Sequence, residues 1–86
     1  MITYYHVYGG NHKTGKSWDI ANFTNLKDAE NYLEAYCEGM GYDVIHHPDE
    51  YVYGELKSKR IQINITTATI FESFDESIKA LQQDLD

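Results

Sequence analysis

The alternation of apolar and polar positions indicates that the chain begins with two β-strands. Residues 2–8 are β-branched and aromatic, and Gly9-Gly10-Asn11 follows them, which predicts a strand that ends in a turn. In residues 16–23, Trp18 and Ile20 occupy alternate positions. This period of two predicts the second strand of a hairpin.

The segment after this hairpin has the spacing of an amphipathic helix. Asn25 is a predicted N-cap, and Asp28 lies where its charge suits the exposed amides of the first turn. Gly39 and Gly41 are of the residue type that commonly ends a helix. The apolar positions between these signals recur three and four residues apart and predict one buried stripe: Leu26, Ala29, Leu33, Tyr36, Cys37 and Met40.

Three further strands and a second helix are predicted in the remaining half. Residues 42–45 and 51–56 each predict a short strand, and the polar segment 46–50 separates them. Residues 61–65 alternate between isoleucine and polar side chains, which predicts a half-buried strand that bends or ends near Thr67-Ala68. A capping box then precedes a helical apolar stripe, with Ser73 and Glu76 in the box and Phe74, Ile78, Leu81 and Leu85 in the stripe.

Together these elements predict a single α+β domain over residues 1–86. The expected order is ββαβββα, with an antiparallel sheet of four to five strands and two helices packed on one face. The 86 residues suffice for one core, and the single cysteine excludes an internal disulfide. The sequence has no apolar run of 18 residues, and its first residues lack the pattern of a signal peptide. We therefore expect a cytoplasmic protein.

The charge of the chain is concentrated in its middle third. The formal net charge is −7, and eight carboxylates lie between Asp28 and Glu55 without an intervening lysine or arginine. Such a field repels nucleic acid and membranes and attracts basic clefts of proteins. We expect these carboxylates to form one continuous outward surface, and we predict that partner contacts are made by Glu30, Glu34, Glu38, Asp43, Asp49 and Glu50.

Three of these carboxylates form a regular row on the predicted helix. Glu30, Glu34 and Glu38 recur every four residues, so neighbouring carboxylates lie about 6 Å apart. This spacing is close to that of phosphates along a nucleic-acid strand, roughly 6–7 Å. An acidic face that serves only solubility is the alternative explanation.

The charge, the small size and the Glu30-Glu34-Glu38 row resemble small phage-encoded inhibitors of host defence, such as anti-CRISPR proteins and other DNA mimics. The resemblance is to a class of proteins, and no motif extends over the chain. It implies a non-enzymatic inhibitor or adaptor that binds a basic, nucleic-acid-handling cleft of a larger protein. A CRISPR effector nuclease whose nucleic-acid loading is blocked is one such partner, and direct nucleic-acid binding is not expected.

Residues Gly10 to Ser17 match the phosphate-loop pattern G-x-x-x-x-G-K-[ST]. A nucleotide-binding loop follows a strand and opens a helix, because the amides at the helix N-terminus hold the phosphates. Here the residues after Ser17 alternate as a strand does, and the first helix signal comes only at Asn25. The segment therefore predicts a hairpin loop.

A zinc site is the remaining chemical alternative. Cys37, His46 and His47 are residue types that bind zinc, and the loop 46–50 follows the helix that carries Cys37. The competing interpretation is that Cys37 is a small apolar core residue and that the histidines are exposed. In this alternative the chain is a small metal-binding or homo-oligomeric structural domain. No nucleophile and base are brought together by the sequence, so no catalytic residue is predicted.

Overall fold

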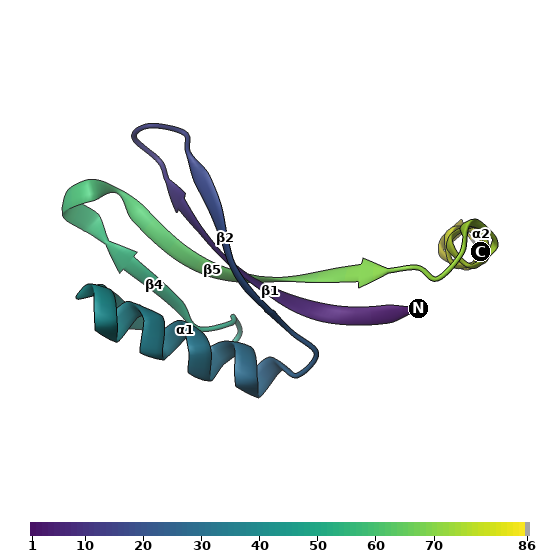
Figure 1. The fold of residues 1–86 in the computed structure, drawn as a ribbon, viewed down its shortest axis with the longest axis horizontal. Coiled ribbons are helices and arrows are strands. Elements are labelled where there is room, and N and C mark those ends of the chain that lie inside the picture. Colours follow the sequence, from purple (N-terminus) through teal and green to yellow (C-terminus); the bar gives the residue numbers. More distant parts are fainter. Residues whose placement is uncertain (86) are drawn as a thin grey trace.

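The computed structural model describes residues 1–85, and the side chains of residues 1–82. Its elements follow the predicted order ββαβββα, with one added 3-10 turn, and form an α+β fold (Figure 1). The five strands make one antiparallel sheet in the order β2-β1-β5-β4-β3. The bounds are β1 Ile2–Asn11, β2 Ser17–Phe23, α1 Leu26–Met40, β3 Asp43–Ile45, β4 Tyr53–Leu56, η1 Lys57–Lys59, β5 Ile61–Ile70 and α2 Phe74–Leu85.

The loop between β1 and β2 is a hairpin, as predicted. Gly10 lies opposite Ser17 in the ladder, and the Asn11 side chain accepts hydrogen bonds from the backbone amides of Lys13 and Thr14. Gly15 has a φ of 75°, a conformation that favours glycine. Because β2 starts at Ser17, the loop leads into a strand and not into a helix, so it lacks the structure that the phosphate-loop pattern requires.

Helix α1 begins and ends where the sequence predicts. The Asn25 side chain accepts a hydrogen bond from the Asp28 amide at 3.3 Å, and Gly41 takes the left-handed conformation with a φ of 75°. The helix covers one face of the sheet (Figure 1) and buries Ala29, Leu33 and Cys37 completely. These three residues form one side of the helix because they lie four positions apart.

The core lies between α1 and the central strands. Val7 of β1 and Ile63 of β5 are fully buried, and Gly54 of β4 lies directly beneath α1. A Cβ atom at Gly54 would lie 2.2 Å from Cys37 Sγ, so the helix and β4 approach as closely as they do only because Gly54 has no side chain. The thiol therefore has a packing role in the core.

Strand β5 is longer than predicted. It continues past Thr67-Ala68 to Ile70, and its last residues pair with the start of β1. The loss of apolar alternation there reflects exposure, because Thr66 and Thr67 face solvent while the backbone ladder continues.

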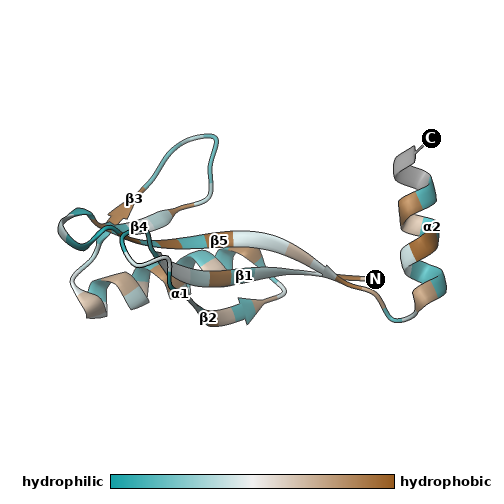
Figure 2. Ribbon diagram, turned by 90° about the horizontal axis from the view of Figure 1, so that it is seen from above, coloured by the Kyte–Doolittle hydropathy of each residue, from teal (hydrophilic) through white to brown (hydrophobic). Residues whose placement is uncertain are grey.

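The expected packing of two helices on one face of the sheet is wrong for α2. Figures 1 and 2 both show α2 beyond the end of the sheet, far from α1 and close to the N-terminus. Phe74 and Leu81 of its predicted apolar stripe are 77% and 55% exposed. Leu85, the last predicted member of that stripe, lies outside the residues whose side chains are described. The sequence indicated an apolar side of this helix correctly, and the rest of the described chain leaves that side largely uncovered.

Candidate protein-binding edge

The predicted row of glutamates lies along one flank of α1. Tyr32 and Tyr36, on the opposite flank, contact β2: the Tyr32 ring lies 5.3 Å from that of Phe23, and Tyr36 Oη accepts a hydrogen bond from Trp18 Nε1 at 3.4 Å. The flank that carries Glu30, Glu34 and Glu38 therefore lies towards β3. An ion-pair distance of 3.5 Å between Glu34 Oε1 and His46 Nε2, just after β3, confirms this orientation.

Asp43 lies on the other face of the sheet. Its neighbour Val44 pairs with Gly54 and packs against the core beneath α1, so Asp43 projects to the face that α1 does not cover. There Asp43 is directly opposite Glu55 of β4. Like charges at this position repel each other, and the Lys57 ammonium, 3.8 Å from Glu55, offsets part of that repulsion.

The loop between β3 and β4 carries the last two predicted contact residues. Asp49 and Glu50 are exposed. Glu50 lines a shallow hollow with Tyr53, Gln62 and Asn64, which places it over the uncovered face of the sheet. The tyrosine in this hollow offers an apolar surface beside the carboxylate.

The six predicted residues therefore lie around one edge of the molecule and do not form the single outward surface that we expected. Strand β3 is the last strand of the sheet. Three carboxylates lie on its helix side, one lies on its opposite side, and two lie in the loop that follows it. We call this group the acidic edge: Glu30, Glu34, Glu38, Asp43, Asp49 and Glu50.

The acidic edge has little compensating positive charge. Among residues 1–82, Glu34 is the only one of the six with a basic side chain within ion-pair distance, and that partner is His46. His46 is 68% exposed, so solvent screens this pair. The edge therefore presents a strongly negative potential to an approaching partner.

The three predicted zinc ligands are not brought together. Cys37 is buried between α1 and β4. His46 faces Glu34, whereas His47 stacks on Tyr53 at the uncovered face of the sheet. The two histidines therefore lie on different sides of the sheet edge. Burial raises the pKa of the Cys37 thiol to about 11, which disfavours the thiolate that zinc requires. Residues 1–82 contain no group of three histidine, cysteine or acidic side chains placed to hold a metal ion.

The structure reveals one polar cluster that the sequence analysis missed. His6 Nδ1 lies 2.5 Å from Asn22 Oδ1, and His6 Nε2 lies 2.9 Å from Asp19 Oδ1. Asp19 and Asn22 are three positions apart and would face opposite sides of a regular strand. They share a face because Ile20 is an extra residue in β2 where the pairing with β1 shifts, which is a β-bulge.

This cluster has the composition of a catalytic site but lacks a free base. Ser17 lines the same hollow as His6, yet both ring nitrogens of His6 already contact Asp19 and Asn22. A histidine that acts as a general base needs one nitrogen facing the reacting group. The cluster therefore fixes β2 against β1 on the uncovered face of the sheet.

Comparison of the chain with protein-family models, with curated protein sequences and with solved structures found no match. Any assignment of function rests on the chain's own geometry and charge. Among the described residues there is no helix with both the length and the apolar character needed to cross a membrane.

Proposed function

We propose that the protein is a non-enzymatic inhibitor or adaptor that acts in the cytoplasm and binds a basic, nucleic-acid-handling cleft of a larger protein. A phage anti-CRISPR protein that blocks nucleic-acid loading of a CRISPR effector nuclease is the class that fits this chemistry. The observation that carries the proposal is the acidic edge, where five of six carboxylates have no basic partner among residues 1–82.

The shape of the edge favours a cleft over a flat surface as its binding site. Glu34 and Glu38 lie on the helix side of β3, and Asp43 lies on the opposite side. An edge that is negative on both sides matches a groove that is basic on both walls, as a groove that encloses nucleic acid is. Carboxylates every four residues on α1 could occupy successive phosphate-binding lysines or arginines in such a groove.

Aromatic side chains near the edge supply apolar contacts. Tyr51 is 39% exposed, and Tyr53 lies beside Glu50 on the uncovered face. Tyrosine is enriched at protein interfaces because its ring buries a large area at a small cost in conformational entropy. Charge would guide the encounter, and these rings would slow dissociation.

Charge reversal tests the proposal. We expect the immobilised protein to capture its partner from a bacterial lysate at low salt and to lose most of it at high salt. The double variant E34K/E38K should bind the captured partner at least about tenfold more weakly. The matched control E72K/D75K changes the net charge by the same amount at the opposite end of the molecule, and we expect it to bind as the wild type does.

Two results would contradict the proposal. One is equal binding by E34K/E38K and the wild type, with far-ultraviolet circular dichroism showing that both are folded. The other is capture of a partner that survives high salt unchanged. Loss of binding in both double variants would show that net charge matters and the acidic edge does not.

A further inference from the structure

The end of the molecule opposite β3 extends beyond the core as an arm. We define the arm as residues 1–4 and 68–82, which comprise the paired ends of β1 and β5 and most of α2 (Figures 1 and 2). The structure measures 45 × 28 × 22 Å, and its Cα radius of gyration is 15.4 Å. A compact chain of this length has a radius of gyration of about 12 Å. The arm accounts for this elongation.

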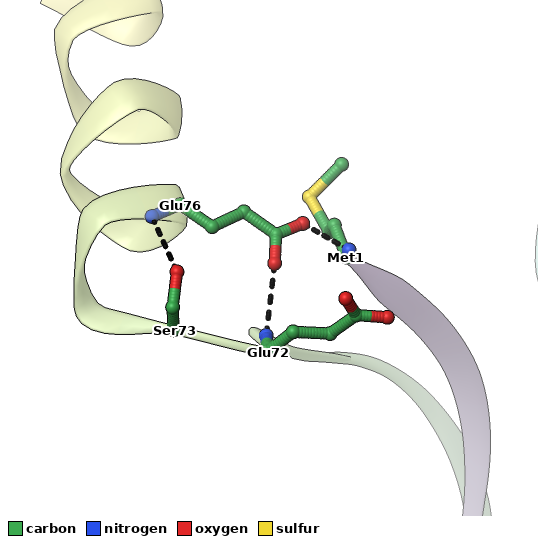
Figure 3. A network of polar contacts seen from close by, with 4 residues as sticks. All are labelled: Met1, Glu72, Ser73 and Glu76. Carbon is green, nitrogen blue, oxygen red and sulfur yellow. Dashed lines mark hydrogen bonds and ion pairs between the residues drawn. The ribbon is translucent and has the colours of Figure 1, made fainter.

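A network of polar contacts joins the first turn of α2 to Met1 and to the residues just before the helix (Figure 3). The Ser73 hydroxyl accepts a hydrogen bond from the Glu76 amide at 3.2 Å, which confirms the predicted cap. The Glu76 carboxylate in turn accepts a hydrogen bond from the Glu72 amide at 2.8 Å and forms an ion pair with the amino group of Met1. The first turn of α2 is thus positioned by polar contacts, and the apolar side of the helix is left largely free.

Most of the large apolar side chains that residues 1–82 expose lie on this arm. Of the nine large apolar side chains that residues 1–82 expose most, six belong to the arm, and each exposes between 39% and 77% of its surface: Met1, Ile2, Ile70, Phe71, Phe74 and Leu81. At roughly 150–200 Å² for each large apolar residue, they present on the order of 600 Å². Exposed apolar surface gathered at one end of a small protein often marks an interaction site.

The strands of the arm also have free backbone edges. Strand β4 pairs with only Ile61, Gln62 and Ile63 of β5, so within the described chain residues 64–70 have no strand partner on that side. The one side-chain hydrogen bond that this segment receives from the chain before β4, among residues 1–82, joins Tyr51 Oη to Thr67 Oγ1 at 3.1 Å. Strand β2 ends opposite Tyr5, so residues 2–4 of β1 have no strand partner on the side where β2 pairs with the rest of β1. A ribbon of two strands is marginally stable in water unless another strand or a packed element supports it.

These edges lack the features that prevent strands of neighbouring molecules from pairing. Residues 61–71 and 1–5 contain no charged side chain, no proline and no glycine. Exposed strand edges in monomeric proteins are usually protected by charge, by proline or by a covering element. The carboxylates of the arm lie between Glu72 and Glu76, outside the two strand segments, so a second copy can approach the strand edges with little repulsion between like charges.

We propose that a second copy of this chain covers the arm and that the protein is a two-fold symmetric homodimer. The free edge of β5 pairs antiparallel with the same edge of the partner, which is the arrangement that two-fold symmetry generates. The apolar side of α2, with Phe74 and Leu81, packs on the ribbon of the partner. A dimer that covers nearly all of this apolar surface in both copies buries about the 1,000 Å² that separates specific interfaces from incidental contacts. The proposal is independent of the acidic edge, which remains free at both ends of the dimer.

Measurement of mass in solution tests this proposal directly. We expect sedimentation equilibrium to give a mass twice the chain mass of 10.0 kDa, with dissociation on dilution. The double variant F74S/L81S should dissociate at a concentration about a hundredfold higher or more, because both side chains lose their buried partner in each copy. The control Y32S/M40S changes two exposed apolar residues on α1 and should remain dimeric.

Hydrogen exchange gives a second readout that needs no substitution. Amides of residues 64–70 that face the free edge should be protected at concentrations where the dimer forms and should exchange on dilution, whereas core amides such as that of Leu33 should be protected throughout. A wild-type protein that is monomeric at all concentrations, or an unchanged dimer in F74S/L81S, would overturn the proposal. A monomer whose arm becomes protected only when lipid vesicles or another protein are added would assign this surface to that partner and would also overturn it.

Discussion

At the residue scale, Cys37 of α1 lies against Gly54 of β4, where a side chain would have no room. Cys37 was placed correctly in the buried stripe of α1, and its burial explains why the zinc alternative has no matching geometry. The need for glycine at position 54 could not be predicted, because it depends on which strand lies beneath Cys37. The cluster of His6, Asp19 and Asn22 could not be predicted, because a bulge changes which face of the sheet the side chains of β2 point to.

The contact between Cys37 and Gly54 leads to a prediction about stability. The variant G54A should lower the free energy of unfolding by roughly 1–3 kcal/mol, because its Cβ would lie 2.2 Å from Cys37 Sγ. Removal of that sulfur in C37A/G54A should make the double variant less destabilised than the sum of the single variants. Urea denaturation measures both effects.

Gly39 offers a matched control for this substitution. A Cβ added at Gly39 in α1 meets no atom within 4 Å, so G39A should raise the free energy of unfolding by up to about 1 kcal/mol through helix propensity. Equal effects of G54A and G39A would show that the close approach of α1 and β4 does not require glycine.

At the scale of elements, the sequence was sufficient to predict the bounds of an element whose ends carry capping or turn residues. Asn25 and Gly41 set the ends of α1, and the turn residues Asn11 and Gly15 set the first hairpin. The position of α2 was not predictable, because an apolar stripe indicates that a helix has a side to bury and does not show what covers it. The length of β5 was underestimated because backbone pairing with β1 continues where apolar alternation stops.

The network at the start of α2 should respond to acid. Hydrogen bonds from the Met1 amino group and, second, from the Glu72 amide lower the pKa of Glu76 below its ordinary value of 4.5. The stabilisation from this carboxylate is therefore complete above pH 4.5 and is lost as the pH falls through the lower pKa of the folded state. In an acid titration followed by nuclear magnetic resonance, the Glu72 amide should shift in this range in the wild type and in D75N, and should shift much less in E76Q. An identical titration in E76Q would contradict this account of the network.

At the scale of the whole molecule, the sequence indicated the amount of negative charge but not its distribution in space. Which carboxylates share a side depends on the strand order β2-β1-β5-β4-β3, which places β3 at the edge with α1 on one side of it. Asp43 and Glu34 were expected on one surface and lie on opposite sides of that edge. The acidic edge and the arm lie at opposite ends of the molecule, so one can bind a partner while the other forms a dimer.

Competition with nucleic acid tests the proposed role of the acidic edge most directly. A partner captured at low salt would be loaded with fluorescent nucleic acid, and displacement of that nucleic acid would be followed by anisotropy as the protein is added. We expect full displacement by the wild type, a titration shifted at least about tenfold to higher concentration for E34K/E38K, and no shift for E72K/D75K. Simultaneous binding of the protein and the nucleic acid to the partner, with neither affecting the affinity of the other, would contradict this account.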